Sequence, residues 1–275
     1  MTRVAPLHLT AASGAAPGSA VRVRSARLLE EDPELGEALG TDAFALAAEC
    51  ARAAVLHVPI GEWRQPVWPT STTSGFGLLM LDGLLLRRVS LGDRGGVELL
   101  AGGDLLRPWQ REDSACSVPR QLGWEVLESC RLAVLDVEFA ERISSFPQIA
   151  GQLMARAMRR SRSFAVNMAI VQQPRVETRV HMLLWHLADR SGTVSPDGVM
   201  LPLRLTQGVL AALVAARRPT VNAALGALER DGKLARTSSG WLLRGLPPGG
   251  PRLEQAPAGP AWSGQPAVGT AAAPR

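Results

Sequence analysis

Apolar residues recur at helical spacing in two neighbouring stretches near the C-terminus. The first stretch follows Thr206 and predicts a short helix with the Thr206 hydroxyl at its N-cap; its apolar face consists of Val209, Leu210, Leu213 and Val214. The second predicts a helix that begins near residue 217 and holds Pro219 in its first turn; its apolar face consists of Val221, Leu225 and Leu228. The small residues Ala215 and Ala216 leave room for a close turn, so the pattern predicts a helix-turn-helix.

A two-stranded wing is predicted directly after this pair of helices. Asp231-Gly232 ends the second helix, and residues 233–237 and 241–244 read as two short strands around Ser238-Ser239-Gly240. The order helix, turn, helix and wing within residues 203–243 makes DNA the leading candidate partner.

The side chains outside the apolar stripe of the second helix suit contacts with DNA. A recognition helix places its N-terminal residues in the major groove, where arginine can bind guanine, asparagine can bind adenine, and a small apolar surface can contact the thymine methyl. Hydroxyl and basic side chains at helix starts and in the wing suit the phosphates. The candidate DNA-binding residues are Thr206, Gln207, Arg217, Arg218, Thr220, Asn222, Ala223, Lys233, Arg236 and Ser238.

The rest of the chain divides by composition. Residues 1–24 are rich in Ala, Gly, Ser and Pro and are expected to be flexible, as is a disordered tail at 247–275. Residues 41–57 have helical apolar spacing, and short apolar runs from 63 to 136 predict an all-β unit.

A long helix is predicted over residues 148–172. Its ragged apolar stripe is compatible with a helix-helix seam, or with packing against the chain's own β unit. The stripe consists of Leu153, Ala157, Phe164, Met168 and Val171. The arginines at 156, 159, 160 and 162 are expected on its solvent side.

Charge favours an anionic partner. The chain of 275 residues has a net charge of +5 and a pI of about 10.3. Residues 175–244 hold ten basic and five acidic side chains, so the net positive charge of this segment alone equals that of the whole chain. No apolar run is long enough for a membrane span or a secretory signal, and we expect a cytoplasmic protein. The three cysteines, Cys50, Cys116 and Cys130, are scattered and are expected to be free thiols.

The segment from Leu205 to Leu234 closely resembles the C-terminal winged-helix domain of Crp/Fnr-type transcription regulators. Residues 79–106 resemble the β-roll of their cyclic-nucleotide-binding-like sensor domain, and 131–149 resemble the last roll strand and the helices before the dimer interface. The resemblance covers about residues 60–246. It implies an α+β fold with a sensor domain at 25–147, a dimerisation helix at 148–173 and a DNA-binding domain at 174–246. It also implies a homodimer on a two-fold operator in double-stranded DNA, with RNA polymerase as a further candidate partner.

Two departures from the family pattern bear on DNA binding. Ala215 stands where the turn often has glycine, and alanine is disfavoured if this position needs a positive φ. Pro219 and Ala223 stand where the best-known members read bases with Glu and Arg, so a different operator is expected.

The family's cyclic-nucleotide motif is missing from this chain. After Gly103-Asp104 there is no Gly-Glu pair and no Arg followed by Ser or Thr, and Arg107, Arg111 and Arg120 lie outside the motif. Cyclic AMP is therefore not the expected effector, whose identity stays open. Three cysteines cannot supply the four ligands of an iron–sulfur cluster, and His57 alone is a poor haem ligand, so no cofactor or metal is predicted.

Two other classes of protein differ from a DNA-binding regulator in the residues that they need. An enzyme on a cupin-like roll needs clustered histidines, but residues 63–136 contain none, and no nucleophile has a recognisable base; we predict that the protein is not an enzyme. The alternative is a ligand-sensing β-roll protein whose winged helix mediates protein contacts rather than reading DNA.

Overall fold

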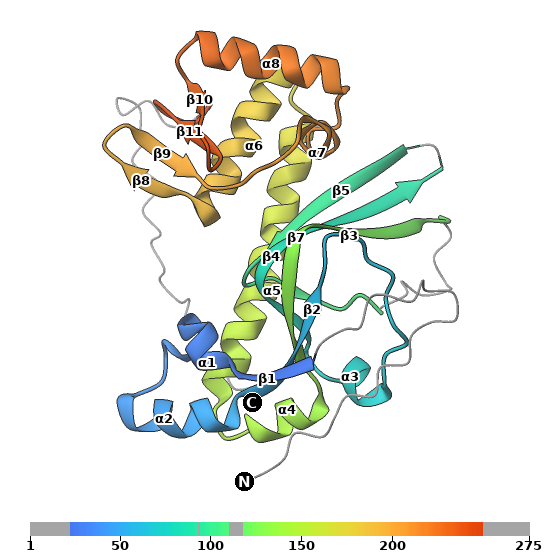
Figure 1. The fold of residues 1–275 in the computed structure, drawn as a ribbon, viewed down its shortest axis with the longest axis vertical. Helices are drawn as coiled ribbons and strands as arrows, with labels where there is room; N and C mark the ends of the chain where they lie inside the picture. The colour runs from blue at the N-terminus through green and yellow to red at the C-terminus, as the bar shows by residue number, and fades with distance from the viewer. Residues whose placement is uncertain (1–22, 93, 110–117, 250–275) are drawn as a thin grey trace, which may run out of the picture.

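A long helix, α5 (Pro147–Val171), connects a β-roll with a smaller winged helix-turn-helix unit (Figure 1). The computed structural model describes residues 23–92, 94–109 and 118–249. The expected α+β class is confirmed. The segments expected to be flexible (1–24) or disordered (247–275) lie mostly outside these residues. The first strand nevertheless begins at Val23, within the segment 1–24.

The roll is built from antiparallel strands in the order β1-β2-β7-β4-β5, with β3 paired to β7 and β6 paired to β4. Gly103, in the turn between β5 and β6, has a φ of 85°, a conformation that glycine adopts without steric cost. The strands are β1 (Val23–Arg27), β2 (Arg52–Val58), β3 (Gly61–Glu62), β4 (Gly77–Leu91), β5 (Arg94–Ala101), β6 (Leu105–Leu106) and β7 (Gln121–Leu135).

Short helices join the first part of α5 around a core that Leu35, Ala47, Phe139, Ile149 and Leu153 share with roll strands. Asp136 caps α4 by accepting a hydrogen bond from the Phe139 amide at 2.7 Å. These helices are α1 (Leu28–Glu31), η1 (Pro33–Gly36), α2 (Thr41–Cys50), α3 (Thr70–Ser74) and α4 (Val137–Arg142).

The prediction of helical structure over residues 41–57 is wrong for the second half of this range. Helix α2 ends at Cys50, and residues 52–58 form β2 between β1 and β7. Five of the seven β2 residues are buried, so the strand is apolar on both faces and lacks the alternation of a half-exposed strand. Such a run cannot be told from a buried helix by periodicity alone.

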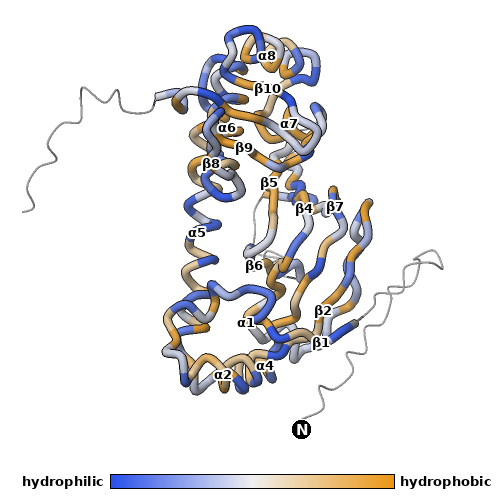
Figure 2. The backbone as a smooth tube through the Cα atoms, turned by 60° about the vertical axis from the view of Figure 1, so that its left-hand side comes forward, coloured by the Kyte–Doolittle hydropathy of each residue, from blue (hydrophilic) through white to orange (hydrophobic). Residues whose placement is uncertain are grey.

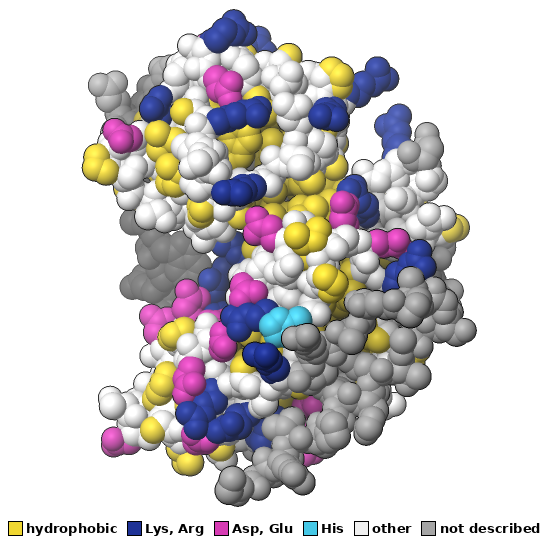
Figure 3. All heavy atoms as spheres, in the orientation of Figure 1, with side chains coloured by type: hydrophobic (Ala, Val, Ile, Leu, Met, Phe, Trp, Pro, Cys, Tyr) yellow, Lys and Arg dark blue, Asp and Glu magenta, His cyan; other side chains and the backbone are white. Residues whose placement is uncertain are grey.

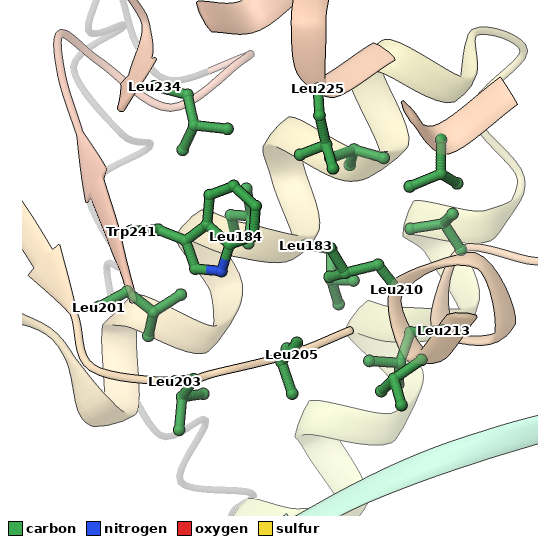
Figure 4. Close-up of a cluster of buried hydrophobic side chains, with 14 of the residues drawn as sticks. Leu183, Leu184, Leu201, Leu203, Leu205, Leu210, Leu213, Leu225, Leu234 and Trp241 are labelled. Atoms are coloured by element: carbon green, nitrogen blue, oxygen red, sulfur yellow. The ribbon is translucent and has the colours of Figure 1, made fainter. Parts of the chain in front are cut away.

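The C-terminal unit packs three helices against a four-stranded sheet of order β10-β11-β9-β8. Its apolar side chains converge between the helices and the sheet, where Trp241 lies near Leu184 and Leu201 (Figure 4). The same core cluster includes Leu84 and Leu86 of the roll strand β4. The elements are α6 (Val176–Ser191), β8 (Thr193–Ser195), β9 (Gly198–Leu201), α7 (Gln207–Leu213), α8 (Arg218–Arg230), β10 (Leu234–Arg236) and β11 (Trp241–Leu243).

Helix α5 runs along one edge of the molecule with the roll on one side of it (Figure 2). Leu153, for which the sequence left open a seam or packing against the chain's own β unit, is fully buried in the chain's own core. Two of the arginines expected in solvent also face inward. Arg156 is 5% exposed and pairs with Asp32, and Arg160 donates two hydrogen bonds to Glu98 at 2.7 and 2.8 Å.

Another face of α5 stays exposed and is largely apolar. Met154, Met158 and Met168 are 63%, 55% and 54% exposed, and Ser161 and Ala165 between them are exposed too. These five residues follow one another at spacings of four, three, four and three, which places them in a single narrow stripe. Among the described residues, no helix is both long and apolar enough to cross a membrane.

Candidate nucleic-acid interface

Helices α7 and α8 form the predicted helix-turn-helix, and α8 lies across the far end of the molecule from the roll helices (Figure 1). The Thr206 hydroxyl caps α7 by accepting a hydrogen bond from the Val209 amide at 3.2 Å. Val221, Leu225 and Leu228 bury the inner face of α8. The opposite face is consequently held toward solvent.

All the predicted α8 candidates are on that outward face. Arg217, Arg218, Thr220, Asn222 and Ala223 are each exposed. Within the described part of the chain, the side chains of Arg217 and Arg218 make no hydrogen bond or ion pair. Basic side chains are visible at this end of the molecule (Figure 3). The positive end of the α8 dipole adds to their charge, so the start of α8 is suited to an anionic ligand.

Gln207 joins the two helices across this surface. It is the first residue of α7, and its Nε2 donates a hydrogen bond to Asn222 Oδ1 on α8 at 2.7 Å. The two candidates are 15 residues apart in the chain and form one polar group on the outward side of the motif.

The turn before α8 has a strained residue and an anchor. Ala215 has a φ of 50°, the only positive φ at a non-glycine residue in the described chain. Arg179 on α6 donates hydrogen bonds to the carbonyl oxygens of Val214 at 3.2 Å, Ala215 at 3.4 Å and Gln173 at 2.6 Å. No local pattern in the sequence indicates this role of Arg179, because its two contacts in the turn lie 35 and 36 residues away.

The wing has its basic residues partly neutralised. Lys233 pairs with Asp231 at 2.8 Å, and this hydrogen bond raises the pKa of Lys233 above its ordinary value. Arg236 pairs with Glu229 at 3.1 Å and lies over the Trp241 ring at 4.9 Å. Ser238 is exposed at the wing turn. The strongest uncompensated positive charge among the candidates therefore belongs to the start of α8 rather than to the wing.

The described residues contain no group of three or more His, Cys, Asp or Glu side chains placed to hold a metal ion. Trp63 and Trp68 belong to the roll core and contact Trp124 and Trp109 at ring-centroid distances of 5.9 and 5.1 Å.

The side chains considered for an effector or cofactor do not form a shared site in the described chain. Arg107 donates to the Thr73 carbonyl oxygen, and His57 is exposed on strand β2. Arg111 and Cys116 lie outside the described residues. Cys50 and Cys130 are free, and burial raises the pKa of the Cys130 thiol to about 12.

Comparison with known proteins places the C-terminal unit in a family. Residues 178–244 match the Crp-like helix-turn-helix domain. A search of curated proteins finds no match.

Solved structures share the wider fold. A cyclic nucleotide-binding domain containing protein from Listeria monocytogenes EGD-e is 17% identical with a TM-score of 0.55, over 68% of this chain and 87% of that one. A CooA mutant from Carboxydothermus hydrogenoformans is 16% identical with a TM-score of 0.51, over 82% of this chain and 94% of that one. FixK2 from Bradyrhizobium japonicum is 16% identical with a TM-score of 0.50, over 70% and 93%. Residues 178–244 thus belong to the Crp-like helix-turn-helix domain family, and the chain as a whole shares the fold of these solved structures, a β-roll followed by a winged helix-turn-helix.

Proposed function

We propose that this protein reads a specific DNA sequence through α8 and binds a two-fold operator as a homodimer. The observation that carries the proposal is the exposed start of α8, where Arg217 and Arg218 have no partner among the described residues. Thr220, Asn222 and Ala223 share that face. Arginine and asparagine at the start of a recognition helix can make bidentate contacts with base edges in the major groove.

The homodimer rests on the exposed stripe of α5. Met154, Met158, Ser161, Ala165 and Met168 repeat at the spacing of the core positions of a coiled coil. Exposed methionines at this spacing favour a second copy of α5 as the occupant, because two such stripes would bury each other. Two-fold symmetry then predicts half-sites about one helical turn apart, roughly 34 Å.

Selection from random duplex DNA tests the first part of the proposal. The full chain should enrich an inverted repeat at moderate salt. Truncation of Arg218 to Ala should weaken specific binding by about 1–3 kcal/mol and relax one base preference. Uniform weakening across all sequences would show that Arg218 only contacts phosphate.

Charge reversal separates DNA reading from the alternative role in protein contacts. Arg217→Glu with Arg218→Glu should abolish DNA binding and leave the dimer intact. If this variant bound DNA as well as the parent does, α8 would not be the reading helix. Absence of any enrichment by a folded, dimeric parent protein would favour protein contacts or a requirement for an effector.

The dimer is tested at the α5 stripe. Met158→Glu should give a monomer in analytical ultracentrifugation, because it places a charge in the seam. Val166→Glu is the matched control, since Val166 is 45% exposed on the same helix but lies outside the stripe. A monomeric parent protein, or equal effects of both variants, would count against α5 as the seam.

A further inference from the structure

The guanidinium of Arg236 in the wing is held from two sides. Its Nε donates a hydrogen bond to Glu229 Oε1 at 3.1 Å, and its Cζ lies 4.9 Å from the centroid of the Trp241 ring. Trp241 is buried and stands directly opposite Arg236 in the β10-β11 pair, so the ring is a rigid support. The Arg236 side chain is still 51% exposed, and its Nη1 and Nη2 groups make no hydrogen bond within the described chain. These two outer groups are therefore open to a ligand.

Glu229 brings this guanidinium to the side of α8 that carries candidate reading residues. Arg218, Asn222 and Glu229 follow one another at spacings of four and seven, which places them along one side of the helix. At about 1.5 Å per residue, Glu229 lies about 10 Å along the helix axis from Asn222. Base edges are read by the N-terminal residues of a recognition helix, so a cation beside its C-terminal half is suited to the phosphate backbone.

An acidic residue at position 229 has little value for the helix itself. Glu229 lies in the last turn of α8, where a negative charge opposes the helix dipole. An exposed ion pair such as this one also contributes little to stability. Its effect on Arg236 is more specific. The guanidinium is a rigid fork, so a carboxylate that accepts from Nε directs the remaining amino hydrogens away from itself.

We propose that Arg236 binds a phosphate of the DNA backbone through Nη1 and Nη2, and that Glu229 is its positioning residue, holding the guanidinium against the Trp241 ring. This rests on the proposed function, since it assigns a backbone contact to the wing beside the reading helix. A free arginine side chain loses rotamer freedom when it binds, and holding it beforehand reduces that loss. Because every base pair carries the same phosphates, the contact strengthens binding to all sequences alike.

Glu229→Ala and Glu229→Gln form the decisive pair of variants. Both remove the same charge, but glutamine keeps an oxygen that can accept from Arg236 Nε. If charge alone mattered, both variants would bind duplex DNA equally, and more tightly than the parent does. Positioning predicts that Glu229→Ala binds roughly 2- to 10-fold more weakly than Glu229→Gln, the affinity equivalent of ordering one long side chain. Glu229 is exposed and both replacements favour helix, so the fold should be retained.

The experiment measures the affinity of the full-length protein for duplex DNA at several salt concentrations. Arg236→Met keeps an apolar stem over Trp241 but removes the guanidinium. It should weaken binding to the selected operator and to an unrelated duplex by the same factor, and reduce the slope of log Kd against log salt by about 0.9. Combined with Arg236→Met, Glu229→Ala and Glu229→Gln should bind equally, because no guanidinium is left to position. Thermal melting confirms that each variant is folded.

The outcomes separate this inference from the function on which it rests. A folded parent protein that binds no duplex DNA contradicts the proposed function itself. A parent that binds DNA, with an affinity and a salt slope that Arg236→Met leaves unchanged, contradicts the phosphate contact alone. Equal affinities of Glu229→Ala and Glu229→Gln in the presence of Arg236 overturn the positioning role. A changed base preference in Arg236→Met would show that Arg236 reads a base, which also overturns the inference.

Discussion

Arg190 on α6 donates a hydrogen bond to the Asp104 carboxylate of the roll at 2.7 Å, and this ion pair ties the DNA-binding unit to the turn before β6. Asp104 is only 3% exposed and also accepts from the Ala101 amide at 2.9 Å. Arg190 reaches the Gly102 carbonyl oxygen as well, at 2.6 Å. It also donates to the Ala101 carbonyl oxygen at 3.4 Å, so the guanidinium contacts three oxygens of one roll turn.

Removal of this guanidinium should destabilise the whole protein. Arg190→Met leaves the buried Asp104 carboxylate without its cation, which should lower the free energy of unfolding by about 1–3 kcal/mol. Urea denaturation measures the loss. Arg162→Met is the control, because Arg162 is exposed on α5 without a partner in the described chain, and its effect should stay within about 0.5 kcal/mol. Equal stability of the two variants would contradict the role of the ion pair.

Arg179 should support DNA binding without contacting DNA. Arg179→Met removes hydrogen bonds to three carbonyl oxygens and should cost about 1–3 kcal/mol of stability. Operator affinity should fall too, since α8 starts directly after the anchored turn. Arg175→Met, at the exposed N-cap of α6, should change neither quantity. Unchanged melting and affinity in Arg179→Met would refute this role.

Ala215→Gly should stabilise the protein. Glycine adopts a φ of 50° without the steric cost that alanine has, although it gains more freedom in the unfolded chain, so the net gain should be about 0.5–1 kcal/mol. Thermal melting detects it. Ala212→Gly within α7 should have the opposite sign and cost a similar amount. A loss of stability in both variants would mean that the turn conformation differs from the one described.

Stability should fall in mild acid because of His181. Burial, and then the nearby Lys233, lower the pKa of His181 below its ordinary 6.5. Its Nε2 accepts a hydrogen bond from the Trp185 indole at 3.1 Å, which only an unprotonated nitrogen can do. The unfolded chain therefore binds more protons, so this contribution is complete above pH 6.5 and is lost as the pH falls toward the folded pKa.

Urea denaturation between pH 7.5 and 5 measures this dependence. His181→Gln keeps an acceptor for Trp185 but does not titrate, so it should flatten the slope. His186 should retain a slope of its own, because burial lowers its pKa as well. An unchanged slope in His181→Gln would contradict the assignment to His181.

The helix-turn-helix was predictable because its signals are local. A capping threonine, a proline in the first turn and apolar side chains at helical spacing all lie within 30 residues and specify the same motif. The position of Ala215 in the turn is a local signal as well, and its φ of 50° agrees with the strain expected there. Strand β2 was not predictable in the same way, because its burial depends on β1 and β7 from distant parts of the chain.

Charged side chains also divide into those whose position follows from nearby residues and those whose partners come from distant parts of the chain. Arg156 looks like a solvated arginine in the sequence, but its partner Asp32 comes from 124 residues away. In the candidate interface, the outward position of Arg217 and Arg218 followed from the stripe of α8. The pairing of Gln207 with Asn222 depends on how α7 and α8 cross, which periodicity does not specify.

The core cluster that includes Leu84 and Leu86 of β4 as well as α6–α8 has a mechanical consequence. Any rotation of α8 relative to the roll must separate these leucines from their neighbours or carry them into another packed arrangement. Close-packed interiors resist intermediate positions, because partial separation loses contacts without burying new surface. A signal from the roll would therefore move the DNA-binding unit in steps between discrete positions, rather than by a gradual tilt.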